Sequence, residues 1–215
     1  MIKAVLFDMD GVLSNTEPLH LNTFKKLFAE RGIMLTDTDV KSVFGKLDED
    51  ILRELFKKKG MKENVAVWAL RKRKMMIPIL KKAKIQAFPG VEKLVKTLAK
   101  SYALGLGTSS SHEELDVIMD KLSLKRYFKV IFGREDVEKH KPDPELYQKL
   151  CDALNAKPNE CVVIEDSVSG IMAAKRAGMR CIAVKNSFPA SKLKQADVVV
   201  ERLDDPRIVR FIAQC

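Results

Sequence analysis

Two carboxylates spaced one residue apart stand where a short apolar segment ends near the start of the chain. Residues 2–7 are apolar except for one lysine, and Asp8, Asp10 and Gly11 follow them. Acidic residues are rare in strands, and a buried carboxylate is costly unless a cation or hydrogen bonds compensate it. The pair therefore indicates a cation and a reaction, and its spacing suits Mg²⁺, a hard ion that takes oxygen ligands.

Three further groups of polar residues occur later in the chain, at or near the ends of other apolar segments. Three hydroxyls follow the apolar segment 103–107 and lead into a helix start, where free backbone N–H groups favour an anion. A lysine stands just before another expected helix, and two carboxylates follow the apolar segment 161–164. These residues are Thr108, Ser109, Ser110, Lys141, Glu165 and Asp166. Together with the first pair of acids they are the groups that Mg²⁺-assisted phosphoryl transfer requires.

The elements that must position these groups alternate along the second part of the chain. Apolar segments predict strands at residues 2–7, 103–107, 130–132, 161–164, 181–184 and 198–200, and helical spacing predicts helices at 91–100, 113–121, 144–154 and 170–177. Strands that are apolar throughout and alternate with helices indicate an α/β fold with a parallel sheet covered on both faces. Such sheets bind ligands at the carboxyl ends of their strands, so we expect all four groups at one edge.

Residues 17–84 show helical spacing and no clear strand. Gly32, Gly45 and Gly60 fall at breaks between the expected helices, and Trp68 is expected in their core. Because the first strand belongs to the sheet, the helical segment is expected to be an insertion after it. We expect a Rossmann-like catalytic core of residues 1–14 and 89–215, and an all-helical cap domain of residues 15–88.

The composition is that of an ordinary globular protein. The chain has 215 residues, of which 46% are hydrophobic, and it has no apolar run near the ~20 residues of a membrane span. Its first residues lack the pattern of a signal peptide. The four cysteines show no paired spacing, so we expect reduced thiols in a cytoplasmic protein without a membrane partner.

The formal net charge of +10 is concentrated in the expected cap. Residues 15–88 hold 17 Lys and Arg against 9 Asp and Glu, which leaves 22 against 20 in the rest of the chain. The basic residues there include the runs 57–59, 71–74 and 81–82. Runs of basic residues are typical of a solvated helix surface, and the other interpretations are a nucleic-acid-binding face or attraction of an anionic substrate. The interleaved apolar residues favour the solvated surface, so we do not expect nucleic acid as a partner.

The four polar groups, in their order along the chain, resemble the motifs of the haloacid dehalogenase-like hydrolase superfamily. The motifs are Asp-x-Asp-Gly, a hydroxyl after an apolar strand, Lys-Pro-Asp-Pro and Glu-Asp-Ser-x-x-Gly-Ile, and the resemblance covers the whole chain. The chain is similar in particular to the branch with a helical cap after the first motif, which includes small-molecule phosphatases and β-phosphoglucomutase. The resemblance implies a Rossmann-like parallel sheet core with an inserted all-helical cap.

The resemblance also implies a role for each motif residue. Asp8 would be the nucleophile that forms an aspartyl-phosphate, and Asp10 would act as general acid and base. Thr108 would hold phosphoryl oxygens and Lys141 would neutralise charge. The implied Mg²⁺ ligands are Asp8, Asp10 through its backbone carbonyl, Glu165 and Asp166. Glu165 either contacts the metal directly or lies in an outer position.

Further residues are candidates for substrate contacts. They are Gly11, Ser109, Ser110, His20, Lys46 and His112. His20 either touches Asp10 or the substrate, or packs at the domain interface. His112 either faces the substrate or only begins a helix.

We expect a phosphatase that acts on a small phosphorylated metabolite such as a sugar phosphate, in a monomer that needs Mg²⁺. The alternative is a phosphomutase of hexose 1-phosphates. In the mutase-like pattern an arginine three residues after the glycine grips a second phosphate, whereas here Asp48 follows Gly45 at that distance. The basic run 71–74 lies near the position of a cap lysine in that enzyme. Binding of a second phosphate by this run therefore remains an alternative.

Other members of the superfamily suggest further readings of this chain. A dehalogenase does not need the Asp10 acid, and a phosphonatase needs a cap lysine that forms an imine. A reading of another class is a non-catalytic binding protein that uses its basic cap. The complete motif set favours the enzyme.

Overall fold

Six parallel strands form one sheet in the computed structural model, which describes residues 1–41 and 46–215. The strands are β1 (Ala4–Phe7), β2 (Ala103–Gly107), β3 (Val130–Phe132), β4 (Cys161–Glu165), β5 (Arg180–Val184) and β6 (Val198–Val200), in the order β3-β2-β1-β4-β5-β6. The α/β fold expected from the sequence is thereby confirmed.

The central position of β1 decides where ligands meet the sheet. Phe7 at its end pairs with Leu106 of β2 on one side and with Ile164 of β4 on the other. Successive strands after β1 are added first on one side and then on the other, so a crevice opens beyond its carboxyl end. Asp8 follows directly, and its backbone N–H donates to the carbonyl of Ile164 at 3.0 Å.

Helices cover both faces of the sheet. They are α5 (Val91–Leu98), α6 (His112–Leu122), α7 (Glu145–Ala153), α8 (Val168–Arg176) and α9 (Pro206–Gln214). Side chains of β1 alternate between the two faces: Ala4 and Leu6 pack on the side of α7 and α8, whereas Val5 and Phe7 pack on the side of α5, α6 and α9. Burial on both faces is the reason that the strands are apolar throughout.

The last helix, α9, was not expected from the sequence, although its signals are present. Asp205 is its N-cap and accepts a hydrogen bond from the backbone N–H of Arg207 at 2.9 Å. Pro206 occupies the first helical position, and Ile208 and Ile212, four residues apart, are its buried side chains. The apolar stripe is only two residues long, so periodicity alone gives a weak signal there.

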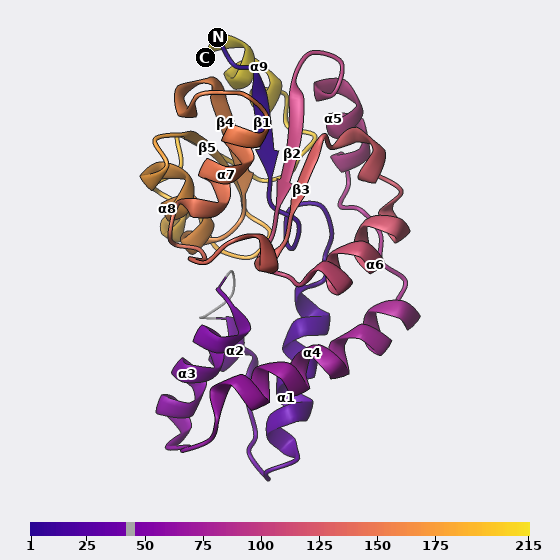
Figure 1. The fold of residues 1–215 in the computed structure, drawn as a ribbon, viewed down its shortest axis with the longest axis vertical. Coiled ribbons are helices and arrows are strands. Elements are labelled where there is room, and N and C mark those ends of the chain that lie inside the picture. Colours follow the sequence, from indigo (N-terminus) through magenta and orange to yellow (C-terminus); the bar gives the residue numbers. More distant parts are fainter. Residues whose placement is uncertain (42–45) are drawn as a thin grey trace.

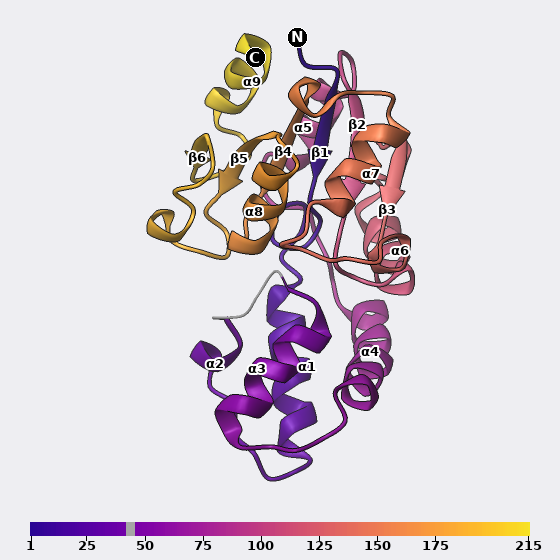
Figure 2. The same ribbon diagram turned by 60° about the vertical axis from the view of Figure 1, so that its left-hand side comes forward.

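A second group of helices lies beyond the carboxyl ends of the strands (Figures 1 and 2). The helices are α1 (Glu17–Ala29), α2 (Asp37–Lys41), α3 (Asp48–Lys59) and α4 (Val65–Lys82). Trp68 is buried in their core, with the rings of Phe28 and Phe56 centred 5.0 and 5.1 Å from it. Its expected core position is confirmed. Gly45, expected at a helix break, lies outside the described residues.

The chain leaves the sheet region and returns to it through two segments that run side by side. Ser14 and Ala87 form an antiparallel bridge, and the backbone N–H of Phe88 donates to the carbonyl of Leu13 at 2.9 Å. Because Leu13 and Ser14 come soon after β1, the helices α1–α4 are attached next to the crevice. A division into a core of residues 1–14 and 89–215 and a cap of residues 15–88 remains our proposal.

We expect Phe28→Ala to lower the free energy of unfolding by about 3–5 kcal/mol, because it deletes a fully buried ring beside Trp68. Trp68 is the only tryptophan of the chain, so its fluorescence during urea unfolding reports on this core. The matched control is Met34→Ala, because that side chain is 80% exposed; it should change stability by less than about 0.5 kcal/mol. A similar small effect for Phe28→Ala would show that the aromatic cluster is not needed for stability.

Candidate active site

Lys141 is the buried cation around which the acidic residues gather. Its Nζ donates to Asp8 Oδ1 at 2.5 Å and to Glu165 Oε1 at 2.7 Å. Burial by itself would lower the pKa of Lys141, but the two carboxylates outweigh it and raise the pKa above its ordinary value. A charged ammonium therefore joins the carboxyl ends of β1 and β4.

Both carboxylate oxygens of Glu165 are occupied by hydrogen bonds. Oε1 accepts from Lys141 and from the hydroxyl of Tyr147, and Oε2 accepts from two backbone N–H groups and from the hydroxyl of Ser167, each of the last four at 2.9 Å. A Cβ atom at Gly170 would lie 1.6 Å from Oε1, so a glycine is needed for the carboxylate to fit. Burial would raise the pKa of Glu165, but Lys141 and the other donors lower it.

Asp8, Glu165 and Asp166 form an acidic cluster that can hold a metal ion. One carboxylate oxygen of each lies within 4.8 Å of the others. Burial, reinforced by repulsion from Glu165, raises the pKa of Asp166 well above its ordinary value, and burial also raises the pKa of Asp8 in spite of Lys141. The single ammonium leaves three buried carboxylates with a surplus of negative charge, which a divalent cation would compensate. The donors are all oxygen atoms and therefore fit Mg²⁺.

Gly11 lies against the acidic cluster and does not line the pocket. Its φ is +81°, in the left-handed region that favours glycine, and a Cβ atom there would lie 1.8 Å from Asp166 Oδ2. Its carbonyl accepts a hydrogen bond from Asn186 Nδ2 at 2.7 Å, and Asp166 accepts one from the hydroxyl of Ser187. The absence of a side chain at Gly11 thus leaves the space that the carboxylate of Asp166 occupies.

Asp10 is oriented by three hydroxyl groups. Oδ2 accepts from Ser110 Oγ at 2.8 Å and from Thr108 Oγ1 at 3.2 Å, and Oδ1 accepts from the hydroxyl of Thr16. The backbone N–H of Ser110 in turn donates to Thr108 Oγ1 at 3.0 Å. Thr108, which was expected to hold phosphoryl oxygens, and Ser110, a candidate for substrate contacts, therefore both contact Asp10 in this structure.

His20, on α1, faces Asp10 from the side of the helical group. Its Nδ1 lies 2.8 Å from Nζ of Lys72, and its Nε2 lies 3.8 Å from Asp10 Oδ1. Burial and the Lys72 charge lower the pKa of His20, so its ring is neutral near pH 7. Since Lys72 can only donate, Nδ1 accepts and the proton of the ring is on Nε2, directed toward Asp10.

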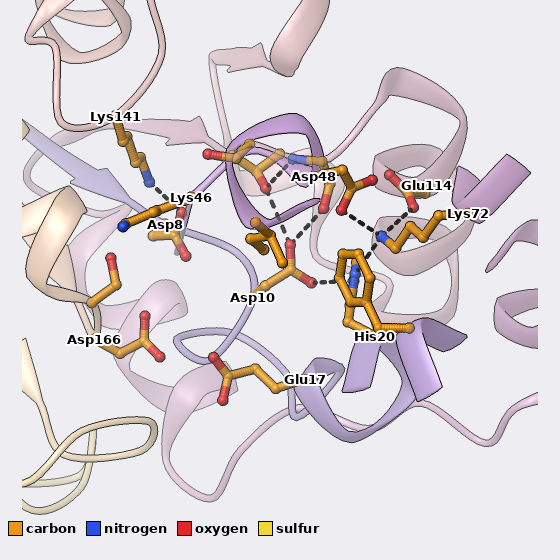
Figure 3. Close-up of a pocket in the computed structure, with 16 residues that line it drawn as sticks. Asp8, Asp10, Glu17, His20, Lys46, Asp48, Lys72, Glu114, Lys141 and Asp166 are labelled. Carbon is orange, nitrogen blue, oxygen red and sulfur yellow. Dashed lines mark hydrogen bonds and ion pairs between the residues drawn. The ribbon is translucent and has the colours of Figure 1, made fainter. Parts of the chain in front are cut away.

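A pocket at the carboxyl edge of the sheet brings most of the predicted residues together (Figure 3). Those that line it are Asp8, Asp10, His20, Lys46, Thr108, Ser109, Ser110, Lys141 and Asp166. Lys46 is paired with Glu54. Glu165 is fully buried next to the pocket, in contact with Lys141.

The structure does not bring His112 into the pocket. Ser111 and Glu114 form a capping box at the start of α6. His112, at the first helical position, points to Asp136, with Nε2 2.9 Å from Oδ2, while Glu114 lines the pocket. Of the two alternatives for His112, contact with the substrate or a position at the start of a helix, the structure shows the second.

Three further pocket residues were not among the candidate site residues predicted from the sequence, although Asp48 was already noted as the residue three positions after Gly45. They are Asp48, Lys72 and Glu114, which meet beside His20 (Figure 3). The capping-box spacing marks Glu114 as a helix-start residue, which gives no sign of a second contact. Lys72 belongs to the basic run 71–74, and only the packing of α4 against α6 makes it the buried member.

An ion-pair network joins the helical group to the sheet region next to the pocket. Glu49 on α3 accepts from Arg134, with its two oxygens 3.0 and 3.2 Å from the guanidinium nitrogens. Arg73 on α4 donates to the same carboxylate at 3.0 Å. Burial would raise the pKa of Glu49, but Arg134 and the other donors lower it to about 2. The network holds α3 over the pocket.

Comparison with known proteins gives matches over most of the chain. A sequence model described as haloacid dehalogenase-like hydrolase matches residues 5–184. A validoxylamine A 7'-phosphate phosphatase of Streptomyces hygroscopicus subsp. limoneus is 30% identical over 210 residues, which are 96% of this chain and 97% of that protein. A phosphorylated carbohydrates phosphatase of Thermotoga maritima is 34% identical over 185 residues, or 84% of each protein.

Solved structures share the fold. The β-phosphoglucomutase of Clostridium difficile superposes with a TM-score of 0.87 at 23% identity, over 100% of this chain and 98% of that one. At this identity the likeness shows the arrangement of sheet and helices alone.

We expect Glu49→Gln to loosen the contact between α3 and the sheet region, because a neutral amide loses the charge-assisted bonds to Arg134 and Arg73. Amide hydrogen exchange in α3 should become faster by about tenfold or more, as the loss of hydrogen bonds to a charged group implies. The contribution of Glu49 is complete above pH 4.5, its ordinary pKa, and is lost as the pH falls toward about 2. Asp50→Asn removes a neighbouring carboxylate that pairs with exposed Arg53, and equal exchange in both variants would contradict the role of Glu49.

Proposed function

The chain belongs to the haloacid dehalogenase-like hydrolase family, and from this premise we propose that it is a Mg²⁺-dependent phosphatase of a small phosphorylated sugar. It is a phosphoric monoester hydrolase of the phosphatase and phosphomutase type. The observation that carries the proposal is the contact of Lys141 with Asp8 at the end of β1, with Asp10 held beside it by three hydroxyls.

Mg²⁺ would be held by Asp8, Asp166 and the backbone carbonyl of Asp10. Bound there, it would compensate the repulsion between a carboxylate nucleophile and an anionic phosphate. Glu165 takes the outer position, because its oxygens already accept five hydrogen bonds and its contact with Lys141 fixes that ammonium beside Asp8. The surplus of buried negative charge supports a cation at this point.

In the first step a carboxylate oxygen of Asp8 attacks phosphorus and the bond to the leaving oxygen breaks. Asp10 gives its proton to the leaving oxygen, so that a neutral alcohol departs. Lys141, bonded to Asp8, balances the charge that Asp8 shares with the phosphoryl group, while Ser109 at the pocket wall offers its N–H to phosphoryl oxygens.

In the second step water attacks the phosphorus of the aspartyl-phosphate. Asp10 takes a proton from this water, inorganic phosphate leaves, and the carboxylate of Asp8 is restored. The hydroxyls of Thr16, Thr108 and Ser110 hold the Asp10 carboxylate in place through both transfers.

The names of the relatives support a sugar phosphate as substrate. One relative at 30% identity is named as a phosphatase of validoxylamine A 7'-phosphate, and another at 34% identity as a phosphatase of phosphorylated carbohydrates. The pocket is lined by hydroxyl, carboxylate and ammonium groups that suit a hydroxylated compound.

Within the described residues no helix combines the length and the apolar character needed to cross a membrane.

We expect the protein to release phosphate from at least one member of a panel of phosphorylated sugars, polyols, glycolate and nucleotides, in the presence of Mg²⁺. EDTA should stop the release, and Asp8→Asn should lower the rate by more than about a thousandfold because the nucleophile is lost. Conversion of a hexose 1-phosphate to its 6-phosphate without phosphate release would instead establish a mutase. An Asp8→Asn protein that keeps more than about a thousandth of the wild-type rate would refute the nucleophile role.

We expect Asp10→Asn to lower turnover by about 10²–10⁴, the usual contribution of a general acid–base group. The substrate's KM should change much less than kcat, since the residue acts in proton transfer. Asp116→Asn is the matched control, because Asp116 is exposed, pairs with Lys125 and does not line the described pocket. An unchanged rate in Asp10→Asn would remove the acid–base role from this residue.

A further inference from the structure

Lys72 is the buried cation of the pocket that the proposed reaction does not use. It lies on α4, its side chain is 1% exposed, and it lines the pocket (Figure 3). Its Nζ is 3.0 Å from Asp48 Oδ1, 3.6 Å from Glu114 Oε1 and 2.8 Å from His20 Nδ1. Asp48 comes from the start of α3 and Glu114 from the first turn of α6, so three elements converge on one ammonium.

The charges at this point do not cancel. Burial would raise the pKa of Glu114, but Lys72 and the hydrogen bonds from Ser111 help to lower it to about 2, so Glu114 is ionised. Burial would lower the pKa of Lys72, but Asp48 and Glu114 outweigh it and raise the pKa, so Lys72 stays charged. One ammonium between two carboxylates leaves a net negative charge at this end of the pocket.

The other cations that line the described pocket are engaged as well. Lys141 is bonded to Asp8 and Glu165, at the position of the reacting phosphate. Lys46 is paired with Glu54. A second phosphate or a carboxylate on the leaving group would therefore lie next to carboxylates in this part of the described pocket. Each lysine that lines it is already paired with an acidic residue.

Two buried polar atoms beside Lys72 have no hydrogen-bond partner. They are Glu114 Oε1, an acceptor, and His20 Nε2, which carries the ring proton and is a donor. Glu114 is 2% exposed, and both residues line the pocket. A hydroxyl group can either donate to Glu114 Oε1 or accept from His20 Nε2, whereas an anionic group can only accept and therefore suits only the histidine.

We propose that Asp48 and Glu114 hold Lys72 in ion pairs, so that its ammonium is not available to bind an anionic group of the substrate. The pocket thereby selects substrates whose leaving group is neutral and hydroxylated and has no second phosphate or carboxylate. Asp48 is the specificity-determining residue, because it neutralises the only buried cation at this end of the described pocket. The proposal rests on the proposed phosphatase function and names its substrate class: polyhydroxylated monophosphates.

The test measures binding in the Asp8→Asn background, so that it does not depend on turnover. Dissociation constants with Mg²⁺ are measured calorimetrically for two pairs of probes, glucose 6-phosphate against glucose 1,6-bisphosphate and glycerol 3-phosphate against 3-phosphoglycerate. The monophosphate without the second anion should bind about tenfold or more tightly in each pair, because like charges at a buried contact are strongly disfavoured. Equal or tighter binding of the doubly anionic probe, or no binding of either monophosphate, would overturn the proposal.

Asp48→Asn tests the residue itself. It should shift the ratio of the two constants by about tenfold toward the doubly anionic probe, since Lys72 then keeps only one acidic partner. The matched control Asp50→Asn lies in the same helical turn and contacts exposed Arg53, and it should leave the ratio unchanged. Adding Lys72→Met to Asp48→Asn should abolish the shift, which a general loosening of α3 would not predict.

The outcomes separate this inference from the proposed function. If Asp48→Asn leaves the ratio within twofold of its starting value, or if Asp50→Asn shifts it equally, the role of Asp48 is wrong even where phosphate release is observed. If the wild-type chain releases no phosphate from any compound of the panel, the phosphatase proposal is wrong, whatever the binding ratios are.

Discussion

The arrangement of the site depends on one buried ammonium, that of Lys141. It lies between Asp8, which directly follows β1, and Glu165, which ends the neighbouring central strand β4. Without it the buried carboxylates at this edge would face one another with hydroxyl and backbone donors alone, a strongly unfavourable arrangement. The tight fit of Gly170 against Glu165 and of Gly11 against Asp166 fixes the carboxylates around this cation. The geometry of the nucleophile is thus set by electrostatics and by backbone shape together.

The sheet and its polar edge could be predicted from the sequence because both depend on local patterns. Apolar strands and helices alternate clearly, and parallel strands must place Asp8, Thr108 and Asp166 at one edge. The side-chain directions beyond that edge could not be predicted. His112 and Glu114 are two residues apart in one helical turn, and only the capping box decides which of them faces the pocket. The short helix α9 has a recognisable N-cap, but its apolar side is only two buried residues long, so helical spacing did not predict it.

The charge of the helical group illustrates the same limit. Its excess of cations was compatible with a solvated surface, a nucleic-acid-binding face or an anionic substrate. In the structure many of these cations have acidic partners, as Lys58 and Lys59 have in Asp39, and Arg71 has in Glu30. These contacts join different helices, and burial of Lys72 depends on packing between α4 and α6. Net charge therefore says less about the ligand than the partners of each cation do.

The attachment of the helical group between β1 and β2 has a consequence for how such a protein changes over generations. The groups proposed to break the phosphate bond lie on the sheet edge and are held by glycine contacts and Lys141. Two of the groups proposed to choose the substrate, Asp48 and Lys72, belong to a separate stretch of chain joined through two adjacent segments, whereas the third, Glu114, lies on α6. A substitution in that stretch can alter the choice of substrate while the nucleophile stays intact. The fold thereby lets selection act on specificity and on chemistry almost independently.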